Sequence, residues 1–207
     1  MTHPQPIVFD LGGVLIDWNP RHLYVPILGE EAAGFLLERI CTPDWNLSMD
    51  AGRPFAEAVA AKAREWPEHA EAIGWWRTRW AEMLGGPIGG TVRILEALQA
   101  AGHATYALSN WSAETFPVAR GRYPFLATFR DIVISGEHGL VKPDPAFYRL
   151  AAARWGIPLE GTVFVDDAPR NVEAARTLGM DAIRFEDPEA LRRALEARGI
   201  RIPAPPA

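Results

Sequence analysis

The segment IVFDLGGVLIDW, residues 7–18, gives the clearest indication of architecture in this chain of 207 residues. Its first three residues form an apolar run, which predicts a short buried strand. The run ends on one carboxylate, Asp10, and the pair Gly12 and Gly13 follows. Because glycine permits a tight departure from a strand, the segment predicts a reactive acid on a rigid platform at the edge of a sheet.

Four further short apolar runs have the same character, and helical patterns separate them. Continuous rather than alternating apolar strands, joined by helices of ten or more residues, are typical of a parallel sheet covered on both faces. We therefore predict a doubly wound α/β core. The four further strands are Thr105–Leu108, Ile132–Ile134, Val163–Val165 and Ala182–Phe185, and the clearest helices start near Thr91, Pro145 and Pro188 and stop at Gly102, Gly156 and Gly199.

The interval 18–85 interrupts this alternation, because it contains helical patterns and no convincing strand. We expect it to be an inserted helical cap, with the core formed by 1–17 and 86–200 and a frayed proline-rich tail at 201–207. The cap is rich in tryptophan, and we expect these rings to form mainly its hydrophobic core. The spacing of one group of residues is typical of a helix: Trp76, Trp80, Met83 and Leu84.

Composition limits the classes of function. The chain is 48% hydrophobic and 23% charged, which suits a globular protein, and its net charge of −5 gives no general attraction to nucleic acid or to an anionic membrane. An anionic substrate must therefore be held by local charges. A single cysteine, Cys41, excludes an internal disulfide and a cysteine metal cluster. No run of eighteen apolar residues predicts a membrane span, and the first residues lack a signal pattern, so we expect a cytoplasmic protein.

Polar residues gather at the ends of the predicted strands, where ligands bind in open parallel sheets. The first strand ends in Asp10, and the fourth ends in Asp166 and Asp167. Each of these residues, taken alone, has an ordinary structural explanation as a cap, a turn or a solvated charge. The complete set adds Ser109 and Asn110 after the second strand and Lys142 after the third.

Together these residues resemble a known pattern. Asp10 in VFDLGGVL, Ser109 in ALSN, Lys142 in GLVKPDP and the acids of VFVDDAPRN are similar, in order and separation, to the four motifs of the haloacid dehalogenase-like hydrolase superfamily. The resemblance covers almost the whole chain and is closest to members with a helical C1 cap inserted after a DLGG first motif. It implies a Rossmann-like core, an aspartate nucleophile and, in most members, Mg²⁺-dependent phosphate hydrolysis.

The charges of these residues support a cation. At about 4 Å and an effective dielectric constant near 20, each pair of like charges costs roughly 4 kcal/mol. Mg²⁺ suits such a site because it prefers hard oxygen ligands and bridges carboxylates to phosphate. We expect Asp10 and Asp167 to contact Mg²⁺, Asp166 to do so directly or through water, and Asn171 to support them.

Three groups complete the expected chemistry. Asp10 attacks phosphorus and forms an aspartyl-phosphate that water later hydrolyses. Lys142 neutralises Asp10 and the phosphoryl oxygens, and Ser109 accepts the remaining charge. Gly12 departs from the pattern, because most phosphatases that the chain resembles carry a second aspartate there as the general acid. Its carbonyl can still bind the metal. Asp17, His22 or a cap residue are alternative proton donors.

Three functions follow from these residues. The first is a phosphatase for a small phosphorylated metabolite. A positioned general acid is worth about 10²- to 10⁴-fold in rate, so its absence favours a substrate whose leaving group needs little protonation, such as a sugar phosphate or another compound with a good leaving group. The second is a metal-independent 2-haloacid dehalogenase, since halide leaves without a proton, but dehalogenases that resemble this fold lack the paired acids. The third is a catalytically weak protein that binds a phosphorylated ligand.

Substrate contacts are the least determined by the sequence. Gly12 and Asn110 are expected beside the nucleophile. Trp18 is a candidate to stack on the substrate at the entrance. Arg53, in the turn that starts at Asp50, is a candidate phosphate or hydroxyl contact. The sequence does not determine the oligomeric state.

Overall fold

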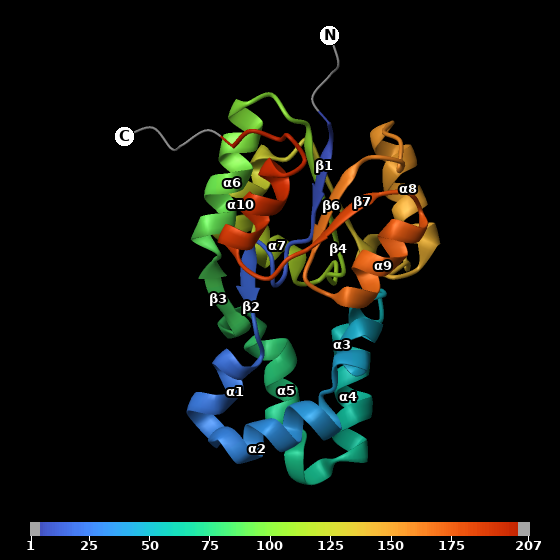
Figure 1. Ribbon diagram of the computed structural model, residues 1–207. Coiled ribbons are helices and arrows are strands. Elements are labelled where there is room, and N and C mark those ends of the chain that lie inside the picture. Colours follow the sequence, from blue (N-terminus) through green and yellow to red (C-terminus); the bar gives the residue numbers. More distant parts are fainter. Residues whose placement is uncertain (1–4, 203–207) are drawn as a thin grey trace.

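A five-stranded parallel sheet forms the centre of the molecule in the computed structural model, which describes residues 5–202 (Figure 1). The strand order is β5-β4-β1-β6-β7, so β1 lies in the middle and the order reverses on either side of it. This confirms the predicted parallel α/β core. The strands are β1 (Ile7–Phe9), β4 (Thr105–Ser109), β5 (Asp131–Ile134), β6 (Val163–Asp166) and β7 (Asp181–Arg184).

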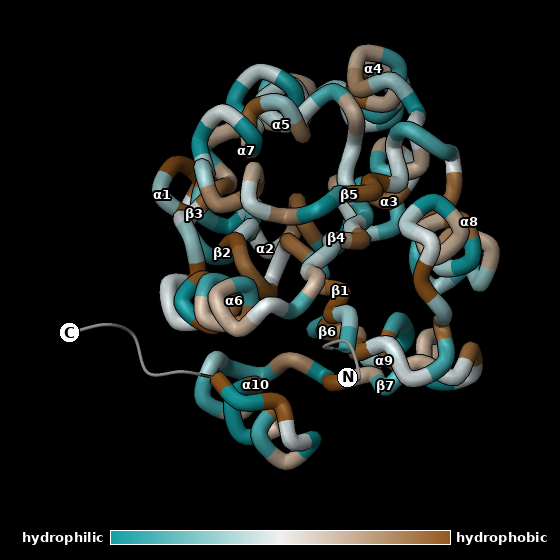
Figure 2. Tube along the Cα trace, turned by 90° about the horizontal axis from the view of Figure 1, so that it is seen from above, coloured by the Kyte–Doolittle hydropathy of each residue, from teal (hydrophilic) through white to brown (hydrophobic). Residues whose placement is uncertain are grey.

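Successive residues of the strands enter two different hydrophobic clusters, because side chains alternate between the faces of a sheet. Ile7 and Phe9 pack with α6 (Gly89–Ala100), α7 (Phe116–Arg122) and α10 (Pro188–Glu196). Val8 packs instead with α8 (Pro145–Trp155) and α9 (Pro169–Thr177). Figure 2 shows the hydrophobic strand segments between these two layers of helices. Burial on both faces explains why the strands are continuously apolar.

Local signals fix the helix ends that the sequence predicts. The side chains of Asp144 and Asp187 accept hydrogen bonds from the backbone N–H groups of Ala146 and Ala190, and a proline occupies the first turn of each helix. These are N-caps with proline in the favoured position. Gly156, with φ +66°, ends α8 in the left-handed conformation that glycine adopts without strain.

A two-stranded antiparallel ribbon joins the core to the helical part of the chain (Figure 1). It consists of β2 (Ile16–Trp18) and β3 (Leu84–Pro87), which stand at the two limits of the predicted cap. The sequence did not predict these strands, because they are short and β3 has the composition LGGP. The helices between them are α1 (Arg21–Leu28), α2 (Glu30–Phe35), α3 (Pro43–Asp50), α4 (Phe55–Glu65) and α5 (Ala70–Thr78).

The helical spacing from Trp76 to Leu84 does not correspond to one helix. The α5 helix ends at Thr78, a short 3₁₀ turn covers Trp80–Met83, and Leu84 pairs with Trp18 in the ribbon. The tertiary pairing of β3 with β2 therefore overrides the local pattern.

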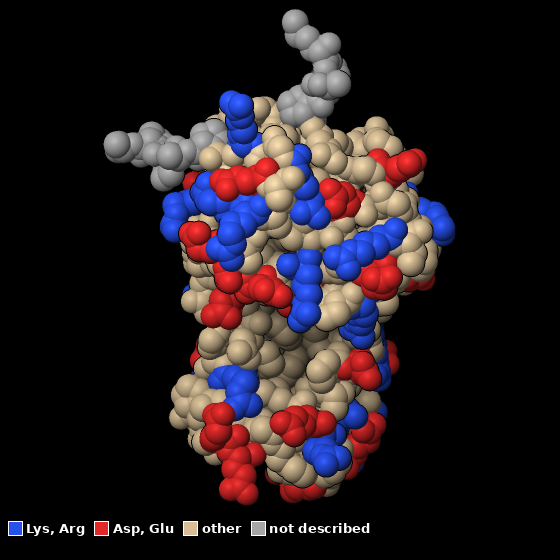
Figure 3. All heavy atoms as spheres, viewed as in Figure 1, with Lys and Arg blue, Asp and Glu red and all other residues tan. Residues whose placement is uncertain are grey.

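The tryptophans of the helical part are largely buried, as expected. Trp76 is 1% exposed, and its ring meets the rings of Trp45 and Trp18 edge-on at centroid distances of 5.2 and 6.4 Å. Figure 3 shows that the molecular surface narrows and is hollowed between the core, above, and the helices, below.

Near the carboxyl end, Ile202 is buried in the hydrophobic core, so the expected frayed tail at 201–207 does not begin at Arg201. Residues 203–207 lie outside the described part of the chain. Among residues 5–202, no helix combines the length and the hydrophobicity that crossing a bilayer requires.

Candidate active site

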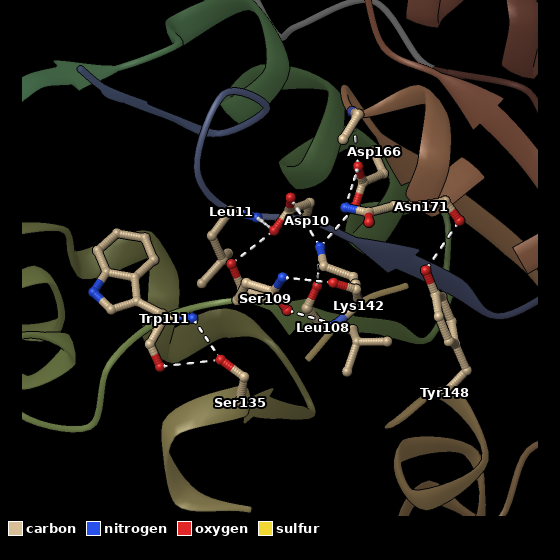
Figure 4. Close-up of polar contacts among 12 residues, drawn as sticks. Asp10, Leu11, Leu108, Ser109, Trp111, Ser135, Lys142, Tyr148, Asp166 and Asn171 are labelled. Atoms are coloured by element: carbon tan, nitrogen blue, oxygen red, sulfur yellow. Dashed lines mark hydrogen bonds and ion pairs between the residues drawn. The ribbon is translucent and has the colours of Figure 1, made fainter. Parts of the chain in front are cut away.

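Three strands deliver a polar side chain to the same point. Asp10 follows β1, Ser109 ends β4 and Asp166 ends β6, and these strands are neighbours in the sheet. Because the strands are parallel and in register, their carboxyl ends meet at one edge, next to the reversal of strand order. Figure 4 shows these side chains turned toward one another around Lys142.

Lys142 lies at the centre of this group and is 1% exposed. Its Nζ atom lies 2.9 Å from Asp10 Oδ2 and 2.6 Å from Asp166 Oδ2, and it donates a hydrogen bond of 2.9 Å to the carbonyl oxygen of Leu108. Burial opposes the charged form of the lysine, but the two carboxylates outweigh it and raise the pKa of Lys142. The ammonium therefore stays charged and is held by three oxygen atoms.

Asp10 has a second set of contacts on its other oxygen. Ser109 Oγ and the backbone N–H of Leu11 each donate a 2.7 Å hydrogen bond to Asp10 Oδ1. Burial raises the pKa of Asp10, Lys142 lowers it and the charge on Asp166 raises it, with a net rise above the usual range of a carboxyl. The carboxylate is thus fixed in orientation by three donors (Figure 4).

Asp166 is fully buried and its two oxygens are already engaged. Besides Lys142, the backbone N–H of Ala168 donates a 2.9 Å hydrogen bond to Oδ1, and Asn171 Nδ2 lies 3.1 and 3.2 Å from the two oxygens. These contacts fix the position of Lys142 and the start of α9. Asp166 is thus the buried partner of Lys142, and its contact with a metal, directly or through water, stays a prediction.

The acids of this site fit a hard divalent cation. Asp10, Asp166 and Asp167 each offer a carboxylate oxygen within 4.8 Å of the others. Asp167 is the exposed member of the three; partial desolvation of its carboxyl group by neighbouring protein atoms, together with the charge on Asp166, raises its pKa. Three neighbouring carboxylates thus outnumber the one ammonium, which contacts Asp10 and Asp166. Asn171 Oδ1 is buried and has no hydrogen-bond partner among residues 5–202, so an acceptor remains free here. Oxygen donors with an excess of negative charge suit Mg²⁺.

A cavity of about 440 Å³ lies between this site and the helices. Its volume falls within the range of ordinary small-molecule sites. A smaller cavity of about 50 Å³ shares four of its lining residues, which are Trp18, Asn46, Asp50 and Asn110. The residues that line the larger cavity are Asp10, Trp18, Pro20, Leu37, Cys41, Pro43, Asn46, Leu47, Asp50, Trp76, Asn110, Asp167, Ala168, Arg170 and Asn171.

Most of the predicted substrate residues lie at these cavities. Trp18 and Asn110 line both, and Gly12 lines the smaller one. Asn110 also exchanges two hydrogen bonds with the backbone of Lys142, at 2.8 and 3.0 Å, and so positions the lysine. Arg53 lies elsewhere: its Nε pairs with Glu57 at 3.1 Å, and it lines neither cavity.

Sequence reasoning missed Asp50, which ends α3 and lines both cavities. Asn46, one turn earlier in the same helix, donates a 2.8 Å hydrogen bond to its Oδ2. The turn that starts at Asp50 was predicted to be a candidate substrate contact, but the residue chosen from it was Arg53. Arg170, which lines the larger cavity beside Asp167, was also not singled out.

The comparisons with known proteins agree with this geometry. The family model of the haloacid dehalogenase-like hydrolases matches residues 6–179, which include all four motifs. The chain belongs to this family. The predicted superfamily is therefore confirmed.

Two curated relatives illustrate the range of proteins to which this sequence is similar. A sesquiterpene phosphatase of Aspergillus oryzae is 29% identical over 190 residues, which is 87% of this chain and 89% of the phosphatase. A drimenol cyclase of Aspergillus calidoustus is 39% identical over 90 residues, 44% of this chain, and the match spans only 17% of that longer protein.

Solved structures share the fold at low sequence identity. A family member from Bacteroides thetaiotaomicron, in complex with magnesium and inorganic phosphate, has a TM-score of 0.66 at 21% identity and covers 89% of this chain and 95% of its own. A dehalogenase has a TM-score of 0.67 at 19% identity, with 90% and 86% covered. This hydrolase is therefore similar in fold both to a family member that binds magnesium and phosphate and to a dehalogenase.

Proposed function

We propose that this hydrolase is a Mg²⁺-dependent phosphatase that acts on a small phosphorylated metabolite through an aspartyl-phosphate on Asp10. The observation that carries the proposal is the excess of negative charge at the nucleophile: Asp10, Asp166 and Asp167 lie together with the single ammonium of Lys142. A dianionic phosphate can approach these carboxylates only with a bound cation. We also propose that the chain is a member with a helical cap after the first motif.

The residues of the site have distinct roles in this reaction. Asp10 Oδ2 attacks phosphorus, while Ser109 and the N–H of Leu11 hold the other carboxylate oxygen. Lys142 stays charged beside Asp10 and stabilises the negative charge that develops on the phosphoryl oxygens. Asp10 and Asp167, with the carbonyl of Gly12, would hold Mg²⁺, and Asn171 would support these ligands. When bound, the ion neutralises charge and orients the phosphate for attack.

The two alternative functions make different demands on the same residues. A 2-haloacid dehalogenase must bind an anionic carboxylate without a metal, and Asp166 and Asp167 beside Asp10 would repel it. A protein that only binds a phosphorylated ligand needs no nucleophile, whereas Asp10 is oriented by three donors and faces the cavity. The geometry therefore favours the phosphatase, and the relationship to a sesquiterpene phosphatase supports the same choice.

The cavity supports a substrate with an apolar part. The wall opposite the carboxylates contains Trp18, Leu37, Leu47 and Trp76. Apolar lining with a few convergent polar groups is usual for small-molecule sites. We therefore propose that the organic part of the phosphate ester contacts this wall, as a hydrocarbon group or the face of a sugar ring would do.

The test is release of inorganic phosphate from a panel of phosphorylated metabolites, with and without Mg²⁺. We expect release that EDTA abolishes and that Asp10→Asn removes. Halide release from haloacetate in the presence of EDTA would instead identify a dehalogenase. Equilibrium binding of a phosphate ester without any release of phosphate would identify a binding protein.

A further inference from the structure

The cavity contains one carboxyl group that the proposed mechanism does not use. Among the described residues that line the two cavities, the carboxylic acids are Asp10, Asp167 and Asp50, and the first two are nucleophile and metal ligand. Asp50 belongs to the helical part and reaches the site from the side opposite the sheet. We propose that Asp50 is the general acid of this enzyme and replaces the acid that Gly12 lacks. The inference rests on the proposed phosphatase activity.

Contacts on both sides fix the position of Asp50. Asn46 Nδ2 donates a 2.8 Å hydrogen bond to its carboxylate, and the backbone N–H of Ser112 in the core is near enough to lower its pKa. The backbone carbonyl of Asp50 accepts a 2.6 Å hydrogen bond from Ser135 Oγ, which in turn accepts one from the N–H of Trp111 at 2.9 Å. The turn is thus docked on the core beside the reaction centre.

The smaller cavity lies between Asp50 and Gly12, the position at which most phosphatases that this chain resembles carry the general acid. Gly12, Asp50 and Asn110 line this cavity together. A Cβ atom added at Gly12 would meet no heavy atom within 4 Å, so this side of the nucleophile is open. A leaving oxygen near Gly12 therefore faces the wall that carries Asp50.

The protonation state of Asp50 is compatible with this role. Burial raises the pKa of Asp50 to about 8, the Ser112 N–H lowers it, the charge on Asp10 raises it and Asn46 lowers it. The neighbouring charged residues are otherwise engaged: Arg53 pairs with Glu57, and Glu114 accepts a hydrogen bond from the N–H of Phe55. Asp50 is therefore largely protonated at neutral pH, as a proton donor must be.

Other proton donors fit less well. Asp17 and His22, the alternatives that the sequence suggests, form a pair with each other at 2.9 Å and line neither cavity. Cys41 lines the larger cavity, but burial raises the pKa of its thiol to about 12. Among the described cavity residues other than the nucleophile and the proposed metal ligands, Asp50 alone combines access to the cavity with a suitable acidity.

The proton balance of the two steps is complete with Asp50. In the first step Asp10 forms a bond to phosphorus, the bond from phosphorus to the leaving oxygen breaks, and that oxygen takes its electron pair and the Asp50 proton. In the second step water attacks the phosphorus of the aspartyl-phosphate and gives a proton to the Asp50 carboxylate. The bond to Asp10 breaks, and phosphate leaves.

The experiment compares leaving groups in Asp50→Asn. For a simple alkyl phosphate we expect kcat/KM, which reports formation of the aspartyl-phosphate and not its hydrolysis, to fall by about 10²- to 10⁴-fold. For p-nitrophenyl phosphate, whose leaving group needs no proton, we expect kcat/KM to fall by no more than about threefold. Asp44→Asn is the matched control, because Asp44 lies on the same helix, is exposed and lines neither cavity. Adding Gly12→Asp to Asp50→Asn should restore alkyl phosphate hydrolysis.

A second measurement does not depend on the variant. In the wild-type enzyme, kcat/KM for the alkyl phosphate should decrease as the pH rises through about 8, because Asp50 loses its proton, while kcat/KM for p-nitrophenyl phosphate should not. Three results would overturn the inference: equal losses of kcat/KM for both substrates in Asp50→Asn, a loss for the alkyl phosphate that comes from KM alone, or the same pH profile of kcat/KM for both substrates. If Asp10→Asn still hydrolyses phosphate esters, or if the wild type releases no phosphate, the proposed phosphatase function itself is wrong, independently of the role of Asp50.

Discussion

The two walls of the cavity differ in how completely their polar atoms are paired. On the sheet side, the ammonium of Lys142 and the carboxylates of Asp10 and Asp166 are buried and joined by contacts of 2.6 to 2.9 Å. On the helical side, the buried indole N–H groups of Trp18 and Trp76 have no partner among residues 5–202. The sheet side is a fixed arrangement of charge with one acceptor, Asn171 Oδ1, that is unpaired within the described chain, whereas the helical side is largely apolar apart from Asn46 and Asp50.

The removal of Lys142 tests the sheet side and has the largest expected effect. Lys142→Met leaves the carboxylates of Asp10 and Asp166 buried without a counter-charge, so we expect the free energy of unfolding to fall by about 3–5 kcal/mol. Phosphate release should fall by at least about 10²- to 10³-fold. Denaturant titration and steady-state kinetics measure the two effects.

Arg154→Met is the control for this variant. Its Nε lies 2.6 Å from Asp131 Oδ2, but the arginine is exposed, and such pairs contribute about 0–1 kcal/mol. Similar losses of stability in Lys142→Met and Arg154→Met would show that the buried contacts of Lys142 contribute no more to stability than an exposed ion pair does.

A smaller effect is expected from Asp167→Asn, which removes one proposed metal ligand without disturbing the buried network. We expect the affinity for Mg²⁺ to fall by about 10- to 100-fold, while the melting temperature without metal stays the same or rises because a like charge is lost. Calorimetric titration with MgCl₂ measures the affinity directly. Glu186→Gln, an exposed acid that lines neither cavity, is the control. An unchanged affinity in Asp167→Asn would remove Asp167 from the metal site.

The sheet side was predictable from the sequence for a physical reason. Parallel strands in register must bring their carboxyl ends together, so the residues after β1, β4 and β6 meet whatever lies between them in the chain. Asp10, Ser109 and Asp166 therefore followed from the positions of three apolar runs. The pairing of Asp166 with Lys142 did not follow, because it depends on how the loop before α8 folds back.

The helical side was not predictable in the same way. Asp50 reaches the cavity because α3 ends there and its turn docks on Ser135. Arg53, three residues later, faces Glu57 instead. Which of two residues three positions apart enters the site depends on how this turn docks on the core, and no local periodicity in the sequence encodes that. The ribbon of β2 and β3 was missed for a related reason, since each strand exists only through its pairing with the other.

Gly12→Asp has a moderate expected effect and connects the two walls. The space around Gly12 accommodates a side chain, so the variant should fold and place a carboxyl beside the leaving oxygen. With Asp50 present, we expect the ratio of alkyl to p-nitrophenyl phosphate hydrolysis to rise by no more than about tenfold, well below the gain in Asp50→Asn. Equal gains in both backgrounds, measured as a double-mutant cycle, would show that the two acids act independently.

The smallest expected effect concerns the apolar wall. Trp18 lines both cavities and its ring packs edge-on against Trp76, so it is held where the organic part of a substrate would lie. Trp18→Ala should raise KM by about fivefold for a phosphate ester with a bulky apolar group, within the ~0.5–1.5 kcal/mol of one aromatic contact. Because inorganic phosphate does not reach this wall, its inhibition constant should not change. Arg53→Ala should alter neither value, since Arg53 is turned toward Glu57. A larger effect on KM from Arg53→Ala than from Trp18→Ala would mean that the basic turn, and not the tryptophan wall, contacts the substrate.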